Sequence, residues 1–379
     1  MPASRRRLVL SALTAALITA TTTAPALGAP VAAPVELLPL PGDATTFTTD
    51  VNESGVVVGF STTRNSLSPR RAVRWDRTGA PTDLGTLGGA TSTANAINEA
   101  GVVVGHAQDA DGDTRAVRWD PDGSVRDLGV LPGGTTSRAE AVGDDGAVAG
   151  VSDTGGRGQR AVRWGPDGVV TELPTPEGTL GSWVNGVNDV GGVVGGAYTG
   201  EGVVALRWDA DGGATVLAGL GGAAHNAVAL ADDGTAVGQS ATPDSFVPVR
   251  WDRDGRVTAL PTGEGIATSV NARGVAAGRV AGRATLWDRY GRSFDLGALP
   301  GGASSHAAHV NDRGVVVGGS QGPGGAVDRP VRWDRLRGLV ELALPAGASA
   351  GSAAQVTESG LVIGDVSLVG GGSRGVLWG

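Results

Sequence analysis

The stretch that decides the fold is Ala96-Ile97-Asn98-Glu99-Ala100-Gly101-Val102-Val103-Val104-Gly105. It places Asn-x-x-Gly between two apolar runs. That arrangement is typical of a tight hairpin built on a type I turn, in which the glycine takes the left-handed conformation. The valine run that follows the turn favours a short β-strand. These ten residues therefore predict two antiparallel strands joined by a turn.

The same pattern recurs along the chain. The residue three before the first glycine is Asn in five copies and a different residue in three. Self-similarity at a fixed period indicates a fold made of repeated units. The eight Gly-x-x-x-Gly copies are Gly55/Gly59, Gly101/Gly105, Gly146/Gly150, Gly191/Gly195, Gly234/Gly238, Gly274/Gly278, Gly314/Gly318 and Gly360/Gly364.

Tryptophan marks a third strand in each repeat. Eight of the nine tryptophans are spaced 36 to 46 residues apart, and each ends a short alternating segment such as 115–119. A turn such as 120–123 and a short apolar segment follow most of them, so one repeat holds four short strands in about 43 residues. Four strands in a unit of this length are typical of a propeller blade. The sequence predicts an all-β, eight-bladed β-propeller, with these eight tryptophans as packing residues between blades: Trp75, Trp119, Trp164, Trp208, Trp251, Trp287, Trp333 and Trp378.

Spacing distinguishes the two faces of this propeller. The distance from the Asn position to the first glycine is three residues in every repeat. The distance from the second glycine to Trp varies from 9 to 16. We name the two faces by their connections. The turn face carries the turns from the first to the second strand and from the third to the fourth. The loop face carries the variable connections, and variable loops on a rigid scaffold are typical of binding surfaces.

The chain ends predict how the ring closes. The last repeat stops at its third strand, 374–378, whereas residues 35–38 have the pattern of a fourth strand without a repeat. Pairing of the two segments would complete the last blade and leave no open strand edge. We therefore expect residues 35–379 to form one domain.

The N-terminus has the features of an export signal. Arg5, Arg6 and Arg7 precede an apolar run over 8–20, and Ala26-Leu27-Gly28 fits a cleavage site. Residues 1–28 are thus a predicted signal peptide, for the general or the twin-arginine route, and residues 29–34 a short linker. We expect a secreted, extracellular, soluble monomer with no membrane span after cleavage. The chain has no cysteine, which excludes disulfides and thiol chemistry, and its net charge of −8 argues against nucleic acid as a partner.

The repeats resemble the HAF-repeat family of bacterial extracellular proteins. The likeness is carried by segments such as 83–89 and 96–105 and covers essentially residues 35–379. In that family the strand before Trp carries His-Ala-Phe, whereas this chain has Arg-Ala-Val at 71–73, 115–117 and 160–162. The resemblance implies an extracellular location and a repeat fold, and it implies no particular chemistry.

Residues with catalytic or metal-binding chemistry are few. Asp50 and Glu140, near the ends of two inner strands, are the one suggestive carboxylate pair for a glycosidase-like reaction. Asp109, Asp111 and Asp113 alternate like the start of a calcium loop, but the later glutamate is missing and an acidic surface turn is the stronger interpretation. We expect no cofactor.

A more informative set of positions lies five residues before each Asn position, where the inner strand leaves the loop face. We call these eight positions the mouth ring, and they read Phe47, Thr93, Arg138, Trp183, Asn226, Ile266, His306 and Ser352. Their diversity beside uniform neighbouring positions indicates either relaxed packing or a functional mouth. The ligand-binding candidates are Phe47, Arg138, Trp183, Asn226 and His306.

Two classes of function remain open. The favoured hypothesis is a non-enzymatic binding module that recognises an extracellular glycan, cell-wall polymer or protein through its loop face. The alternative is a polysaccharide hydrolase or lyase at the mouth of the channel, which would use Asp50 and Glu140.

Overall fold

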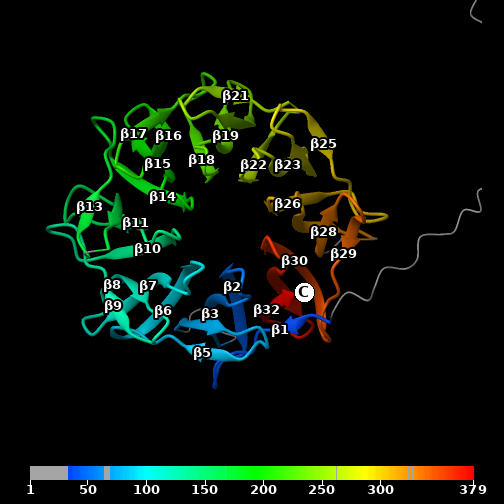
Figure 1. The fold of residues 1–379 in the computed structure, drawn as a ribbon, viewed down its shortest axis with the longest axis horizontal. Helices are drawn as coiled ribbons and strands as arrows, with labels where there is room; N and C mark the ends of the chain where they lie inside the picture. The colour runs from blue at the N-terminus through cyan, green and yellow to red at the C-terminus, as the bar shows by residue number, and fades with distance from the viewer. Residues whose placement is uncertain (1–32, 64–68, 167, 262, 323, 326–327) are drawn as a thin grey trace, which may run out of the picture. The chain divides into compact units, whose positions relative to one another are not determined.

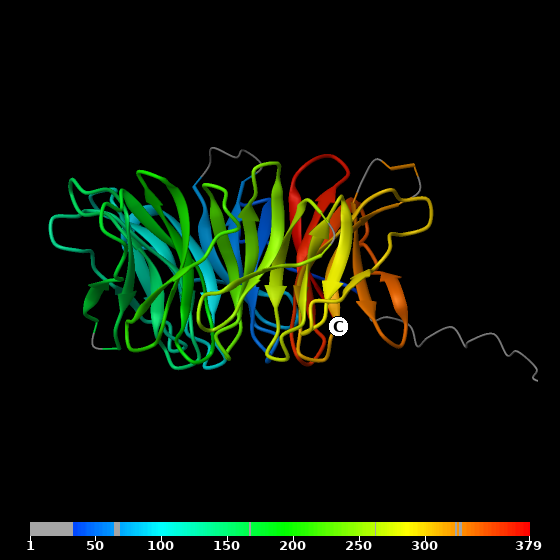
Figure 2. The same cartoon turned by 90° about the horizontal axis from the view of Figure 1, so that it is seen from above.

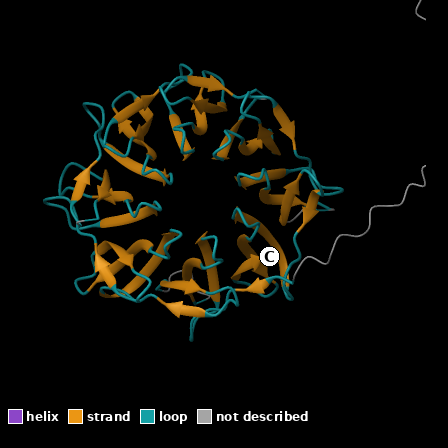
Figure 3. Ribbon diagram, in the orientation of Figure 1, coloured by secondary structure: helices purple, strands orange, loops and turns teal. Residues whose placement is uncertain are grey.

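The strands predicted for one repeat form one four-stranded antiparallel sheet, with the tryptophan on the third strand. The structure is a computed structural model that describes residues 33–379, except 64–68, 167, 262, 323 and 326–327. Eight such sheets are arranged around a common axis (Figure 1), and Figure 3 shows them as strands joined by loops. The predicted all-β, eight-bladed propeller of four-stranded blades is confirmed.

We number the blades in chain order and give the strands of each from the axis outward. Blade 1 contains β2 (Thr45–Val51), β3 (Val57–Thr62), β4 (Arg71–Trp75) and β5 (Pro81–Asp83). Blade 2 contains β6 (Gly88–Ile97), β7 (Val103–Asp109), β8 (Thr114–Trp119) and β9 (Val125–Asp127). Blade 3 contains β10 (Ser137–Val142), β11 (Val148–Ser152), β12 (Arg160–Trp164) and β13 (Val170–Glu172). Blade 4 contains β14 (Gly181–Val187), β15 (Val193–Thr199), β16 (Gly202–Trp208) and β17 (Ala214–Leu217).

The second half of the ring repeats this order. Blade 5 contains β18 (His225–Leu230), β19 (Ala236–Ala241), β20 (Phe246–Trp251) and β21 (Val257–Ala259). Blade 6 contains β22 (Gly265–Val270), β23 (Ala276–Val280), β24 (Arg283–Trp287) and β25 (Ser293–Asp295). Blade 7 contains β26 (Ser305–Val310), β27 (Val316–Gln321), β28 (Asp328–Asp334) and β29 (Gly338–Glu341). Blade 8 contains β30 (Ala348–Val356), β31 (Val362–Leu368), β32 (Ser373–Trp378) and β1 (Val35–Glu36).

The N-terminal strand closes the ring, as the chain ends predict. Val35 pairs with Leu377, and the backbone N–H of Leu37 donates to the carbonyl of Gly375. Glu36 lies 3.7 Å from Arg374. Five other blades contain a pair of this kind between their third and fourth strands: Arg71–Asp83, Arg115–Asp127, Arg160–Glu172, Arg283–Asp295 and Arg329–Glu341. The N-terminal segment therefore completes blade 8 both in its backbone pairing and in its ion pair.

The second glycine of each repeat is required by a β-bulge in the inner strand. In blade 2 the register of β6 against β7 shifts between Ala94 and Ala96, and the other inner strands shift at the equivalent place. The bulge brings the carbonyl of Thr93 against Gly105, where a Cβ atom would lie 2.1 Å from that oxygen. The first glycine has a different role, because Gly101 adopts a φ of +80° in the turn.

The core lies between blades, and each interface is built around one tryptophan. Trp119 of blade 2 packs with Val58 and Ala72 of blade 1, and the seven other tryptophans occupy equivalent clusters between neighbouring blades. All eight side chains are at most 4% exposed. The prediction that this set of tryptophans is structural is confirmed.

The two classes of connection lie at opposite edges of the ring (Figure 2). The Asn turns form the predicted tight hairpins, in which for example Gly101 N–H donates to the carbonyl of Asn98. Among the described residues no helix is long and apolar enough to cross a membrane. The predicted signal peptide, 1–28, and most of the predicted linker, 29–34, lie outside the described residues.

Candidate functional site

The mouth ring lies on the eight inner strands, at their loop-face ends, as expected. Its side chains face residues of the second strand in the same blade, for example Phe47 opposite Phe60 and Ser352 opposite Asp365. Arg138 is exposed, Thr93 is buried, and the other six positions are partly buried. The ring therefore combines packing positions with accessible ones.

The five ligand-binding candidates contact different neighbours rather than one another. Phe47 stacks on Phe60 with ring centroids 4.9 Å apart. His306 Nε2 lies 3.1 Å from Ser352 Oγ in the next blade. Asn226 Oδ1 accepts a hydrogen bond of 2.9 Å from the side chain of Asn185. These contacts divide the ring into separate local sites.

Trp183, partly buried, packs beside an exposed aromatic residue. Its ring centroid lies 4.7 Å from that of Tyr198, which is 55% exposed. Leu180, 66% exposed, precedes the same inner strand and donates its N–H to the carbonyl of Tyr198. Sequence reasoning missed Tyr198 because it lies three residues beyond the second glycine, near the end of β15 and before a variable connection. The rarity of tyrosine was the signal that could have identified it, because the chain has only two.

Asp50 and Glu140 both contact β6, from opposite neighbouring blades. Asp50 Oδ2 accepts a hydrogen bond of 2.8 Å from the backbone of Ile97, and Glu140 Oε2 accepts one of 3.2 Å from Asn95. Burial raises the pKa of Asp50 to about 6. Burial also raises the pKa of Glu140, against the opposing charge of Arg138. Each carboxyl group is thus held beside β6 in an environment that favours its protonated form.

A polar arc on the inner strands of blades 6, 7, 8 and 1 was not predicted from the sequence. Ser269 Oγ accepts a hydrogen bond from the backbone of the next blade, and His309 Nδ1 does the same at 3.5 Å. Gln355 continues the arc by donating to Asp50. Blades 2 to 5 have Ala96, Ala141, Gly186 and Ala229 at the equivalent positions. Asp50 therefore belongs to an inter-blade hydrogen-bond chain as well as to the candidate pair.

A second buried acid makes stability depend on pH. Asp365 Oδ1 accepts a hydrogen bond of 3.0 Å from the backbone of Thr48, and burial raises the pKa of Asp365 to about 7. Between about pH 4 and pH 7 the folded chain keeps a proton here that the unfolded chain releases, so this group lowers the free energy of unfolding as pH rises. His309, whose pKa burial lowers to about 4, has the opposite effect between about pH 4 and pH 6.5.

We therefore expect Asp365→Asn to stabilise the protein more at pH 8 than at pH 4.5. Asparagine keeps the oxygen that accepts from Thr48 and removes the ionisation. Urea unfolding of the parent and the variant at the two pH values measures the difference in the free energy of unfolding. The contribution of histidine titration is the same in both proteins, so it drops out of this difference. An equal gain at both pH values would contradict the raised pKa.

The candidate calcium residues form a tight hairpin between β7 and β8. Asp109 Oδ1 accepts hydrogen bonds from the backbone N–H groups of Asp111 and Asp113. Among residues 33–379, apart from the undescribed positions, no group of three acidic or histidine side chains is placed to hold a metal ion. The carboxylate of Asp109 organises the turn.

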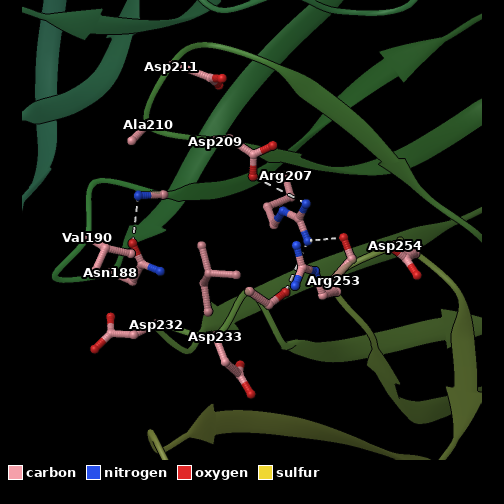
Figure 4. A pocket seen from close by; sticks show the side chains of 13 residues that line it. Asn188, Val190, Arg207, Asp209, Ala210, Asp211, Asp232, Asp233, Arg253 and Asp254 are labelled. Atoms are coloured by element: carbon pink, nitrogen blue, oxygen red, sulfur yellow. Dashed lines mark hydrogen bonds and ion pairs between the residues drawn. The ribbon is translucent and has the colours of Figure 1, made fainter.

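Clefts lie on both faces. On the loop face, Arg138 lines one of about 180 Å³ and Ile266 one of about 480 Å³. A wider cleft of about 930 Å³ lies on the turn face between blades 4 and 5 (Figure 4). Its lining includes Arg207, Asp209, Asp232 and Arg253. Sequence reasoning assigned no cleft to the turn face, because uniform turn spacing says nothing about the space between neighbouring turns.

Comparison with known proteins shows the fold alone. No family model and no curated protein matches the chain. A streptogramin B lyase structure is 12% identical, with a TM-score of 0.46, over 92% of this chain and 97% of that one. A puromycin hydrolase is 17% identical with a TM-score of 0.50, over 86% of this chain and 58% of that one. Dipeptidyl peptidase 4 of Porphyromonas gingivalis is 8% identical with a TM-score of 0.50, over 83% of this chain and 55% of that one. The chain thus spans little more than half the length of the last two.

Proposed function

We propose that the chain is an exported β-propeller that binds an extracellular glycan or cell-wall polymer on its loop face, at Trp183 and Tyr198. The observation that carries this proposal is the tilted contact of these two rings, in which Tyr198 is 55% exposed and Trp183 is partly buried, whereas the other eight tryptophans are buried. Aromatic side chains offer a large apolar face with a polar tip, which suits the flat face and hydroxyl groups of a sugar ring. The export signal predicted for residues 1–28 and the resemblance to HAF-repeat proteins support the extracellular location.

We expect Trp183→Ala to weaken polysaccharide binding about tenfold or more, equivalent to ~1.4 kcal/mol, and to leave the melting temperature nearly unchanged. A glycan array and a cell-wall pull-down of the intact protein identify the ligand, and titration of the variant measures the loss. Val216→Ala is a matched control, because Val216 is 53% exposed on the outer strand of the same blade. Equal binding by both variants, or no binding by the intact protein, would refute the proposal.

The second candidate function is a polysaccharide hydrolase or lyase that uses Asp50 and Glu140. The raised pKa of both carboxyl groups beside β6 favours it. Turnover of a bound polysaccharide that is lost in both Asp50→Asn and Glu140→Gln would support this function. Binding without turnover favours the binding module.

A further inference from the structure

On the turn face, arginine side chains donate hydrogen bonds to backbone carbonyls of the next blade. We call each such contact an arginine staple. Arg207, directly before Trp208, crosses to blade 5 and donates hydrogen bonds of 3.2 Å to the carbonyl of Gly234 and 2.7 Å to that of Arg253 (Figure 4). Its guanidinium also lies 3.2 Å from Asp209 and its side chain is only 8% exposed. The site has three parts: the carbonyl of the next turn glycine, the carbonyl two residues after the next tryptophan, and an aspartate after its own tryptophan.

The two carbonyl contacts of this staple recur at two other interfaces. Arg250 donates hydrogen bonds of 2.8 Å to the carbonyls of both Gly274 and Arg289. Arg163 donates to the equivalent carbonyls of Gly191 and Ala210. Three consecutive interfaces therefore hold a guanidinium group with the same two backbone carbonyls, whereas the aspartate is not constant, because Gly165 follows Trp164.

The interface between blades 6 and 7 has leucine, Leu286, in place of this arginine. Both acceptors are still present, since Gly314 is the next turn glycine and Arg335 follows Trp333 by two residues. Neither carbonyl accepts a hydrogen bond from any residue that the structure describes. Asp288, the equivalent of Asp209, is also retained.

The space that an arginine side chain would occupy at this interface is open. Leu286, Asp288, Phe294, Gly314 and Arg335 all line a cleft of about 480 Å³. A Cβ atom built on Gly314 would meet no atom within 4 Å. The Leu286 side chain therefore does not fill the space that the arginine side chain occupies at the stapled interfaces, and a hollow remains.

The interface between blades 8 and 1 provides a contrast. It too lacks the arginine, because Leu377 precedes Trp378. There, however, the side chains of Arg77 and Leu361 fill the space: a Cβ atom on Gly55 would lie 2.5 Å from Arg77 Nε and 3.0 Å from Leu361. The hollow between blades 6 and 7 is therefore not a general result of losing the arginine.

Arg292 does not replace the missing staple. Its Nε lies 2.6 Å from Asp288, but its side chain is 73% exposed. It approaches the aspartate from solvent and makes no hydrogen bond to Gly314 or Arg335. An exposed pair of this kind contributes little free energy, so an incoming cation can take its place.

We propose that the cleft between blades 6 and 7 binds the guanidinium group of an arginine side chain supplied by another peptide. The guanidinium would donate to the carbonyls of Gly314 and Arg335 and pair with Asp288, while the aliphatic part of the side chain lies on Leu286. Arginine suits this site better than lysine, because its planar fork presents donors in fixed directions. This site lies on the turn face and is independent of the proposed glycan site at Trp183.

Titration calorimetry with arginine blocked at both ends, as the N-acetyl methylamide, tests the proposal. We expect blocked arginine to bind, and blocked citrulline and blocked lysine to bind at least tenfold more weakly. Leu286→Arg should abolish binding and raise the melting temperature, because the chain's own guanidinium then occupies the site. Absence of binding by blocked arginine, or equal binding of arginine and citrulline, would overturn the proposal.

A second variant keeps the test independent of how Leu286→Arg folds. Asp288→Asn keeps the oxygen that accepts from the backbone of Tyr290 and Arg292, so the turn is retained while the charge is lost. We expect it to weaken binding of blocked arginine several-fold. Asp209→Asn is the matched control, since Arg207 already fills that site. Equal affinities of the two variants would also overturn the proposal.

Discussion

A chain that begins at Pro39 is expected to lose most of its stability relative to one that begins at Ala29. The shorter chain lacks β1, so β32 becomes an open strand edge, and it loses Leu37, which is fully buried. Deletion of a buried leucine side chain alone costs about 2 to 5 kcal/mol. The lost backbone hydrogen bonds add about 1 kcal/mol each. Urea unfolding measures the loss, and size-exclusion chromatography measures association through the exposed edge.

Point variants distinguish the effect of ring closure by β1 from the effect of shortening the chain. Leu37→Ala should cost about 2 to 5 kcal/mol. Leu38→Ala should cost far less, because that side chain is 50% exposed and contributes mainly its carbonyl, which accepts from Trp75 Nε1. A peptide of residues 33–42 added to the shortened chain should restore stability by pairing with β32. Full stability of the shortened chain without the peptide would show that the ring does not depend on β1.

Trp119→Ala is expected to lower the free energy of unfolding by about 3 to 5 kcal/mol, as for other large aromatic deletions in cores. Trp119 is 1% exposed and fills the interface between blades 1 and 2, so its removal leaves a cavity that two rigid sheets cannot close. Chemical denaturation measures the loss. Trp183→Ala, which removes the partly buried tryptophan of the mouth ring, is the comparison and should cost much less.

Phenylalanine substitutions test the role of the indole N–H in this layer. Trp119 Nε1 is buried and has no hydrogen-bond partner among the described residues, so Trp119→Phe removes an unsatisfied donor along with some volume. Trp75 Nε1 donates a hydrogen bond of 2.7 Å to Leu38, so Trp75→Phe leaves a carbonyl unpaired and should cost more. The opposite order would contradict this account of the interface.

The fold was predictable because its determinants are local and repeat eight times. The Asn-x-x-Gly turn, the strand that ends at Trp and the orphan segment 35–38 each have a pattern that can be read within about ten residues. The β-bulge was not predictable, although its consequence, the second glycine, stands in every repeat. A bulge depends on how two strands align, and only the close approach of the Thr93 carbonyl to Gly105 reveals why the glycine is needed.

The candidate site was predictable only in part. The mouth ring lies where the spacing places it, but its members contact different neighbours, and Tyr198 was not identified. The pairing of Asp50 and Glu140 around β6 also depends on blade order, which brings residues about 90 positions apart beside the same strand.

The sequence alone determined the repeat, the number of blades, the structural tryptophans and the segment that closes the ring. These features follow from local turn chemistry and from apolar patterns that hold in any repeat. Only the tertiary structure decided which side chains cross between blades: the arginine staples, the polar arc with Asp50, and the hollow left by Leu286. Such contacts join residues some 40 positions apart through the distance and angle between two sheets. A leucine in place of an arginine is a single difference in the sequence, and only the surrounding carbonyls and open space show that it leaves a site.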